Sequence, residues 1–174
     1  GNHDVYVVPE PNSSFSATQA NAIRDFVAAG GGLFVVADHA GADRNNDGID
    51  PVEAWNGLFG SIQDVFGIRF QANTITDSPN SNILDDPSSP ILHGAFGDVI
   101  GTTYYAGATI NIDPTKNPTV QALIWKTGTP QGSNTNVTFA TAEYGLGRVA
   151  AIGDSSPADD GTGPGNLQDG WNDP

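Results

Sequence analysis

The sequence predicts an α/β fold with a mixed, mainly parallel open sheet of the flavodoxin-like type, flanked by helices and followed by a late antiparallel hairpin. Three observations predict this class. Short apolar, β-branched runs alternate with segments of helical periodicity, glycine-rich breaks separate them, and a tight turn joins the last two runs. The 174 residues suffice for one domain, so we expect residues 1–153 to form it and residues 154–174 to be its Asp/Gly-rich tail or loop.

The N-terminal segment predicts a strand–helix–strand unit. Residues 4–8 are apolar and β-branched, and we expect them to form a buried strand. Ser16 and Gln19 form a capping-box pattern at the start of a helix that ends at the glycines 30–32. Residues 33–37 then form a second buried strand. Because one helix connects the two strands, they should be parallel with a right-handed crossover.

A second helix is predicted in the middle of the chain. Asp50 is its expected N-cap, Pro51 its first residue and Gly67 its end. Residues 68–72 alternate between apolar and polar side chains, which indicates a third strand. Residues 76–90 are dominated by Asp, Ser, Pro and Asn, so we expect a loop there.

The second half of the chain is predicted to be mainly β-structure. Residues 99–112 and 120–125 have β-like patterns. Residues 137–144 and 148–152 read as two strands that are joined by a tight turn at 145–147, which predicts an antiparallel hairpin.

Composition excludes several partners. Acidic residues outnumber Lys and Arg by 20 to 6, which gives a formal charge of −14 and argues against nucleic acid, because the cations that neutralise phosphates are few. No apolar run is long enough for membrane insertion. Cysteine is absent, which is compatible with a secreted or periplasmic protein. We expect other domains of a longer polypeptide as partners, and a small-molecule or glycan substrate is left open.

The loop at 43–50 predicts a calcium site. Asp43, Asn45 and Asp47 occupy positions 1, 3 and 5 of a D-x-N-x-D-G pattern, and the carbonyl of Ile49 follows at position 7. Position 12 is Ala54, so the acidic ligand of an EF-hand is missing. The predicted ligands, including two nearby acids that could substitute, are Asp43, Asn45, Asp47, Ile49, Asp50 and Glu53.

Two interpretations of this loop stay open. Asp50 and Glu53 are equally explained as the cap and capping-box partner of the second helix, and the loop itself could be a plain series of Asx turns. Against this, several carboxylates crowd within a short segment, and a divalent cation would relieve their repulsion. We therefore expect Ca²⁺ here, or another divalent cation, in a mainly structural role.

Candidate catalytic residues follow two predicted strands. Asp38 and His39 come after the second strand, and Asp154 and Ser155 come after the last one. If both strands end at the same edge of the sheet, these four residues meet there. They would then suit a metal-assisted hydrolase in which water or Ser155 is the nucleophile. The alternative is that each aspartate only caps the next turn.

Longer strings resemble a known family. Residues 4–9, 26–36 and 145–154 resemble the class I glutamine amidotransferase-like fold, in its uncharacterised and ThuA-like branches. The resemblance implies that His39 matches a histidine after the second strand of ThuA-like proteins, and it excludes glutaminase activity because the required Cys is missing. Taken together, we expect a calcium-binding, amidotransferase-like domain of an exported, bacterial-type protein, with the metal-assisted hydrolase as the alternative.

Overall fold

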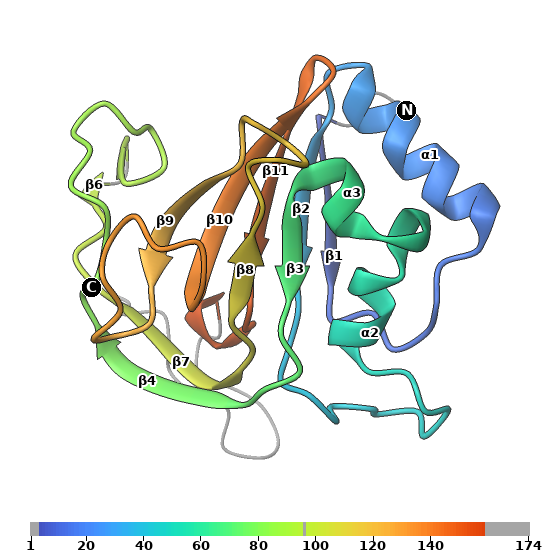
Figure 1. The fold of residues 1–174 in the computed structure, drawn as a ribbon, viewed down its shortest axis with the longest axis horizontal. Coiled ribbons are helices and arrows are strands. Elements are labelled where there is room, and N and C mark those ends of the chain that lie inside the picture. The colour runs from blue at the N-terminus through green and yellow to red at the C-terminus, as the bar shows by residue number, and fades with distance from the viewer. Residues whose placement is uncertain (1–3, 96, 159–174) are drawn as a thin grey trace.

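A computed structural model describes residues 4–95 and 97–158 of the chain, and its centre is a seven-stranded sheet (Figure 1). The strands of this sheet are β1 (Val5–Pro9), β2 (Gly32–Val36), β3 (Ile68–Phe70), β8 (Ile110–Ile112), β9 (Gln121–Trp125), β10 (Val137–Tyr144) and β11 (Gly147–Ile152). They are ordered β1-β2-β11-β10-β8-β3, and β9 also pairs with β10.

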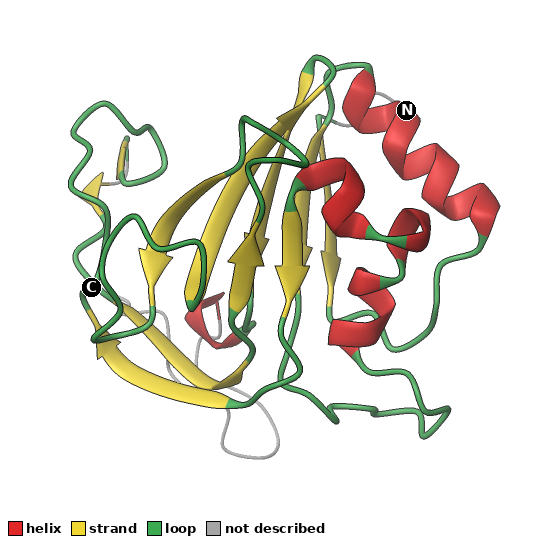
Figure 2. Ribbon diagram, in the orientation of Figure 1, coloured by secondary structure: helices red, strands yellow, loops and turns green. Residues whose placement is uncertain are grey.

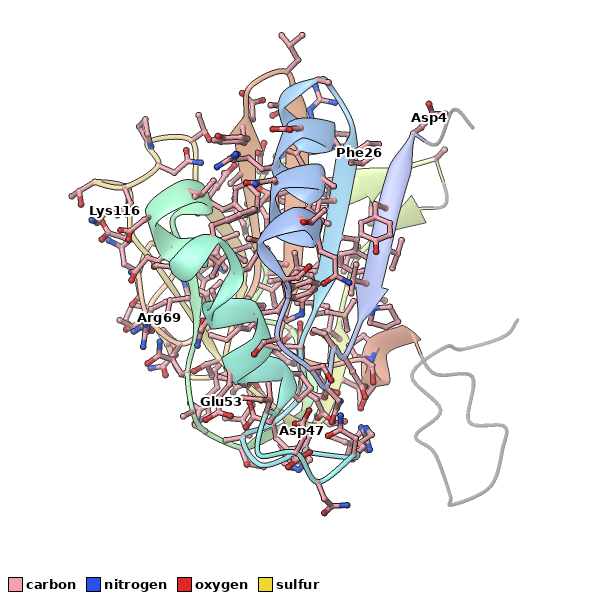
Figure 3. All side chains as sticks on the ribbon, turned by 90° about the vertical axis from the view of Figure 1, so that its right-hand side faces the viewer. Asp4, Phe26, Asp47, Glu53, Arg69 and Lys116 are labelled. Atoms are coloured by element: carbon pink, nitrogen blue, oxygen red, sulfur yellow. The ribbon has the colours of Figure 1, made fainter. Side chains whose placement is uncertain are left out.

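Helices cover one face of this sheet (Figures 2 and 3). They are α1 (Ala17–Ala28), α2 (Pro51–Asn56), the 3₁₀ turn η1 (Leu58–Gly60) and α3 (Ile62–Phe66). Leu33 and Val35 point from β2 into the core that the helices share, with Trp55 fully buried in it. On the opposite face of the sheet, Val36 packs against Tyr104 of a second, smaller sheet.

The smaller sheets come from the segment between β3 and β8. β4 (Ile75–Asn80) pairs with β7 (Thr102–Gly107), and β5 (His93–Gly94) pairs with β6 (Gly97–Asp98). The expectation of a plain loop at 76–90 was therefore wrong at its start, because β4 makes an irregular antiparallel pair there despite its Pro, Asp and Asn residues. A short 3₁₀ turn, η2 (Ser156–Ala158), ends the described part of the chain.

The predicted strand–helix–strand unit and the late hairpin are confirmed. β1 and β2 are parallel with Val5 opposite Gly32, and Ser16 forms the predicted capping box with Gln19. β10 and β11 are antiparallel. However, only the β1–β2 and β2–β11 pairs of the described sheet are parallel, so the sheet is mixed rather than mainly parallel. The fold is α/β, and the flavodoxin-like arrangement is not confirmed.

The predicted burial of the first strand was wrong. Val5, Tyr6 and Val7 expose 57%, 48% and 51% of their surface. The reason is position, because β1 is the outermost strand and has a partner on one side only within the described chain. An apolar run alone cannot distinguish an edge strand from a central one.

The second helix is broken where a continuous one was predicted. Gly57 ends α2, and Phe59 and Gly60 adopt positive φ angles of 63° and 82°, which no α-helix accommodates. Gly67 ends α3 in the left-handed conformation, as predicted.

The described residues include no helix that is long and apolar enough to cross a membrane. Most of the predicted tail, from residue 159 onward, lies outside the described residues.

Candidate active site

Strand register brings two buried carboxylates together at one edge of the sheet. β2 and β11 are parallel neighbours with Val36 opposite Ile152, and the pairing continues as the Ala37 N–H donates to the Ile152 carbonyl over 3.0 Å. Asp38 and Asp154 each lie two residues beyond this pair, and they expose 5% and 2% of their surface. The structure thus places the ends of the two strands at the same edge.

Glu10 adds a third acid that the sequence analysis missed. It directly follows β1, and its backbone N–H donates to the Val36 carbonyl over 3.0 Å, so it also lies at the carboxyl end of a parallel strand. Its φ is +42°, an uncommon angle for a residue other than glycine. The available signal was its place two positions past the predicted strand at 4–8, directly after Pro9.

Asp38 and His39 form a hydrogen-bonded pair. The Asp38 Oδ1 atom accepts from the His39 backbone N–H at 2.7 Å and lies 2.8 Å from His39 Nδ1. A proton on Nδ1 would leave Nε2 with a free lone pair. The His39 side chain is 33% exposed, so the ring has access to solvent. This is the arrangement of a carboxylate that orients a histidine base.

Arg44 fixes the other oxygen of Asp38. One guanidinium nitrogen, Nη2, donates to Asp38 Oδ2 over 2.6 Å and to Glu10 Oε2 over 2.7 Å. The hydrogen bond with Glu10 raises the pKa of Arg44 above its ordinary value. Arg44 therefore ties the loop at 43–50 to the ends of β1 and β2, a role that the sequence analysis did not predict.

Asp154 is held by the backbone of β7 and by the start of η2. Its Oδ2 accepts from the Tyr105 N–H at 2.6 Å, and its Oδ1 accepts from the backbone N–H and the hydroxyl of Ser156 at 3.0 and 2.8 Å. Burial raises the pKa of Asp154, and the charge of Asp38 adds to that effect. A Cβ on Gly107 would come within 2.6 Å of the Asp154 Cβ, so glycine is required there.

Ser155 is not joined to the other candidates by its side chain. In the described residues its hydroxyl makes no hydrogen bond with His39 or Asp154, whereas the neighbouring Ser156 does bond to Asp154. Ser156 thus takes a structural part that the sequence analysis did not assign.

The predicted calcium loop folds as a series of Asx turns. Asp43 accepts from the Gly48 N–H at 2.8 Å and from the Asp47 N–H at 3.3 Å, and Asp47 Oδ1 accepts from the Ile49 N–H at 2.9 Å. Asn45 Nδ2 donates to the Asn12 carbonyl, Ser13 Oγ and Asp47 Oδ2, at 2.6, 3.2 and 3.1 Å respectively.

Asp50 and Glu53 act as the cap of α2. Asp50 Oδ1 accepts from the Glu53 N–H at 2.8 Å, its Oδ2 accepts from the Gly41 N–H at 2.6 Å, and Glu53 Oε2 accepts from the Asp50 N–H at 3.4 Å. Within residues 4–95 and 97–158, no three His, Asp or Glu side chains are arranged to hold a metal ion. Calcium binding therefore stays a prediction.

Similarity to known proteins is limited to the fold. No protein-family model matches the chain, and no curated protein is significantly similar to it. Among solved structures, the chain is similar to the mmIFT52 N-terminal domain, with a TM-score of 0.60, 15% identity, and coverage of 87% of this chain and 65% of that one. The cytoplasmic protein STM3548 from Salmonella typhimurium gives a TM-score of 0.55, 13% identity and coverage of 92% and 63%.

A large enzyme also contains a similar region. A β-galactosidase from Rahnella sp. R3 gives a TM-score of 0.53 and 16% identity, over 87% of this chain but 20% of the enzyme. The chain thus spans less than two thirds of each of these proteins. Identities this low establish a shared fold and nothing about activity.

The expected resemblance to class I glutamine amidotransferases was wrong. The similar structures are the IFT52 domain and Salmonella cytoplasmic proteins such as STM1381 and STM3548, not members of that family. The mixed sheet also differs from the mainly parallel one that the resemblance implied. Strings such as the one at 26–36 mark a helix followed by a buried strand, and many α/β folds share that pattern.

Proposed function

We propose that the chain carries a hydrolytic site in which His39 activates a water molecule. The observation that carries the proposal is that Asp38, which is buried and also bonded to Arg44, lies 2.8 Å through Oδ1 from Nδ1 of a solvent-accessible His39 ring. With the Nδ1 proton directed at Asp38, Nε2 accepts a proton from water while the water oxygen attacks an ester carbon or phosphorus. The imidazolium then returns the proton to the leaving group.

The surrounding residues hold this pair in place. Arg44 and His39 occupy separate oxygens of Asp38, so the carboxylate is fixed from both sides. Asp154 stands beside it as a second buried acid and joins β11 to β7. Water is favoured over Ser155 as the nucleophile because the Ser155 hydroxyl makes no hydrogen bond with His39. The substrate class stays open between small-molecule and glycan esters.

The experiment compares two histidines whose Nδ1 atoms lie at the same distance from an aspartate, which is buried in one pair and exposed in the other. His93 lies 2.8 Å from Asp98 and is also 33% exposed, but it sits in the separate β5–β6 sheet. On a panel of carboxylic, phosphate and glycan esters, His39→Gln should lower kcat/KM by roughly 100-fold or more, while His93→Gln leaves it unchanged. Turnover that survives His39→Gln, or no turnover on any ester, would contradict the proposal.

A second proposal is that the loop at 43–50 binds Ca²⁺ in a structural role. Its support is that three oxygens, from Asn12, Ser13 and Asp47, all lie within 3.2 Å of one nitrogen of Asn45. Turning the Asn45 amide would give up the hydrogen bond that its oxygen accepts from the Asp47 N–H at 3.1 Å, but it would present that oxygen to the same point. A cation there would then replace the amide hydrogens. A secreted or periplasmic location, where calcium is abundant, is part of this proposal.

Calcium titration followed by thermal unfolding tests the second proposal. Millimolar Ca²⁺ should raise the Tm of the wild-type chain by several degrees, and Asp47→Asn should abolish the rise. Asp113→Asn is the matched control, since Asp113 accepts from the Thr115 N–H at 2.9 Å in a similar exposed Asx turn elsewhere. Equal Tm values with calcium and with a chelator would overturn this proposal and leave the hydrolytic one intact.

A further inference from the structure

The outer side of β1 offers unpaired backbone groups. On the inner side, the Asp4 carbonyl accepts from the Gly32 N–H at 2.8 Å and the Glu10 N–H donates to the Val36 carbonyl at 3.0 Å. The backbone N–H and C=O groups of successive residues point to opposite sides of a strand. The backbone groups of the even-numbered residues therefore point toward β2, and those of Val5 and Val7 point outward. No strand pairs with this outer side in the described chain.

The edge also lacks the features that usually protect such strands. Natural edges carry charged side chains, bulges or a covering loop. Here Val5, Tyr6 and Val7 are 48–57% exposed and uncharged. Pro9, which has no N–H to donate, hinders the pairing of another strand only at the end of β1. An apolar edge with free donors and acceptors is a template for another strand.

A hollow lies on each side of this edge. On the helix side, a hollow of about 490 Å³ is lined by Tyr6 of β1 and by apolar side chains that include Phe15, Ile23 and Phe26. Figure 3 shows Phe26 on α1 beside β1, with Asp4 at the start of that strand. On the other face, a hollow of about 590 Å³ is lined by Val5, Phe34 and Ile91, among others. Val5 lines both hollows.

These hollows match the geometry of an added strand. Successive side chains of a strand point to opposite faces, so an extended segment beside β1 would direct alternate side chains into the two hollows. Backbone hydrogen bonds to Val5 and Val7 would supply affinity, and the hollows would select the side chains.

Charge identifies the kind of segment that fits. Asp4 precedes β1. Among the described residues, Asp86 and Glu143 line the hollow of about 590 Å³, and Arg148 is the one cation there. Hydrogen bonds from Ser88 lower the pKa of Asp86, so that carboxylate stays ionised at neutral pH. The whole chain has a formal charge of −14, which disfavours pairing with a second copy. A segment with Lys or Arg complements this surface.

We propose that β1 is a docking edge for an extended segment of a partner protein that combines alternating apolar residues with basic ones. This inference is independent of the hydrolytic proposal, because neither hollow is lined by Asp38, His39 or Asp154.

The test uses a synthetic probe, the acetylated and amidated peptide Lys-Lys-Val-Thr-Val-Thr-Val-Lys-Lys. We expect saturable binding by fluorescence anisotropy, weaker binding at high salt, and slower hydrogen exchange at the Val5 and Val7 amides. Val7→Pro removes one outward N–H while leaving the bonds to β2, so it should weaken binding at least tenfold. Val5→Lys places a positive charge against the peptide and should also weaken binding, even if the proline variant does not fold.

Controls distinguish binding of a basic strand at β1 from nonspecific binding and from pairing with a second copy of the chain. Leu146→Ala removes an 83% exposed apolar side chain at the β10–β11 turn and should bind the peptide like the wild type. The same peptide with Glu in place of Lys should not bind. Absence of saturable binding, binding that both β1 variants retain, or a concentration-dependent dimer that protects the Val5 and Val7 amides without peptide would overturn the proposal.

Discussion

At the scale of single residues, the acids at the carboxyl edge of the sheet have different hydrogen-bond partners. Asp38 accepts a hydrogen bond from the Arg44 guanidinium and contacts His39, whereas Asp154 accepts hydrogen bonds only from uncharged groups, the Tyr105 and Ser156 amides and the Ser156 hydroxyl. Burial without a cation disfavours the ionised form, and this is why the pKa of Asp154 is raised.

The raised pKa of Asp154 predicts a pH dependence of stability. The pKa of Asp154 in the folded state lies above the usual 3.8. Its contribution to the free energy of unfolding is therefore fully present below pH 3.8 and is lost as the pH rises through the folded-state pKa. Asp154→Asn removes this titration. In urea unfolding across that range, the free energy of unfolding of the wild type relative to the variant should fall as the pH rises. A relative stability that rises with pH would contradict the shift.

Sequence reasoning reached part of this site. Asp38, His39 and Asp154 were predicted to share one edge because they follow apolar runs, and the register of β2 and β11 places both aspartates there. A catalytic role for these residues stays a proposal. Glu10 and Arg44 were missed because their roles depend on which strands are neighbours and on how a loop folds back. Neither property leaves a pattern in the local sequence.

At the scale of elements, β7 and β10 enclose a group of hydroxyls without partners. In the described chain, Tyr104 Oη, Thr102 Oγ1 and Thr138 Oγ1 are buried and lack hydrogen bonds of acceptable geometry. Burial raises the pKa of Tyr104 to about 12, although the nearby threonine hydroxyls act in the opposite direction. The aromatic ring itself packs against Val36 and Ile152, on the face of the main sheet away from the helices. The ring therefore stabilises the fold more than its hydroxyl does.

This contrast predicts the effect of two substitutions at one position. Tyr104→Phe removes only the unpaired hydroxyl, so the free energy of unfolding should change by less than about 1 kcal/mol. Tyr104→Ala also removes the ring and should cost about 3–5 kcal/mol. Chemical unfolding measures both. A loss of about 2 kcal/mol or more in the Phe variant would show that the hydroxyl has a partner, such as a buried water.

Helix ends that depend on local sequence signals were predicted correctly. Features that depend on which strands pair in the folded chain were missed. The capping box at Ser16 and the helix end at Gly67 are local features, and both occur as predicted. β4 was missed because its irregular pairing with β7 overrides a composition that is typical of loops. The exposure of β1 depends on strand order, which residues 4–8 do not encode.

At the scale of the whole molecule, the fold places the proposed hydrolytic site and the proposed docking edge on separate surfaces. The acids, His39 and Arg44 lie at the carboxyl ends of β1, β2 and β11, whereas the docking edge runs along the outer side of β1 (Figure 1). The α/β class and its parallel N-terminal unit followed from sequence periodicity. The expected family resemblance was wrong, because strings of fold-level residues recur in many α/β proteins, and the similar structures named above share 13–16% identity with this chain.

The most direct test of the hydrolytic site is the kcat/KM of Asp38→Asn, measured beside Asp98→Asn, on an ester that the wild type hydrolyses. Asn at position 38 cannot hold His39 as a carboxylate does, so we expect a loss of roughly 1,000-fold or more in a variant that circular dichroism shows to be folded. Asp98→Asn alters the similar His93 pair at 2.8 Å and should retain full activity. Equal activity of the two variants would contradict the role proposed for Asp38 and His39.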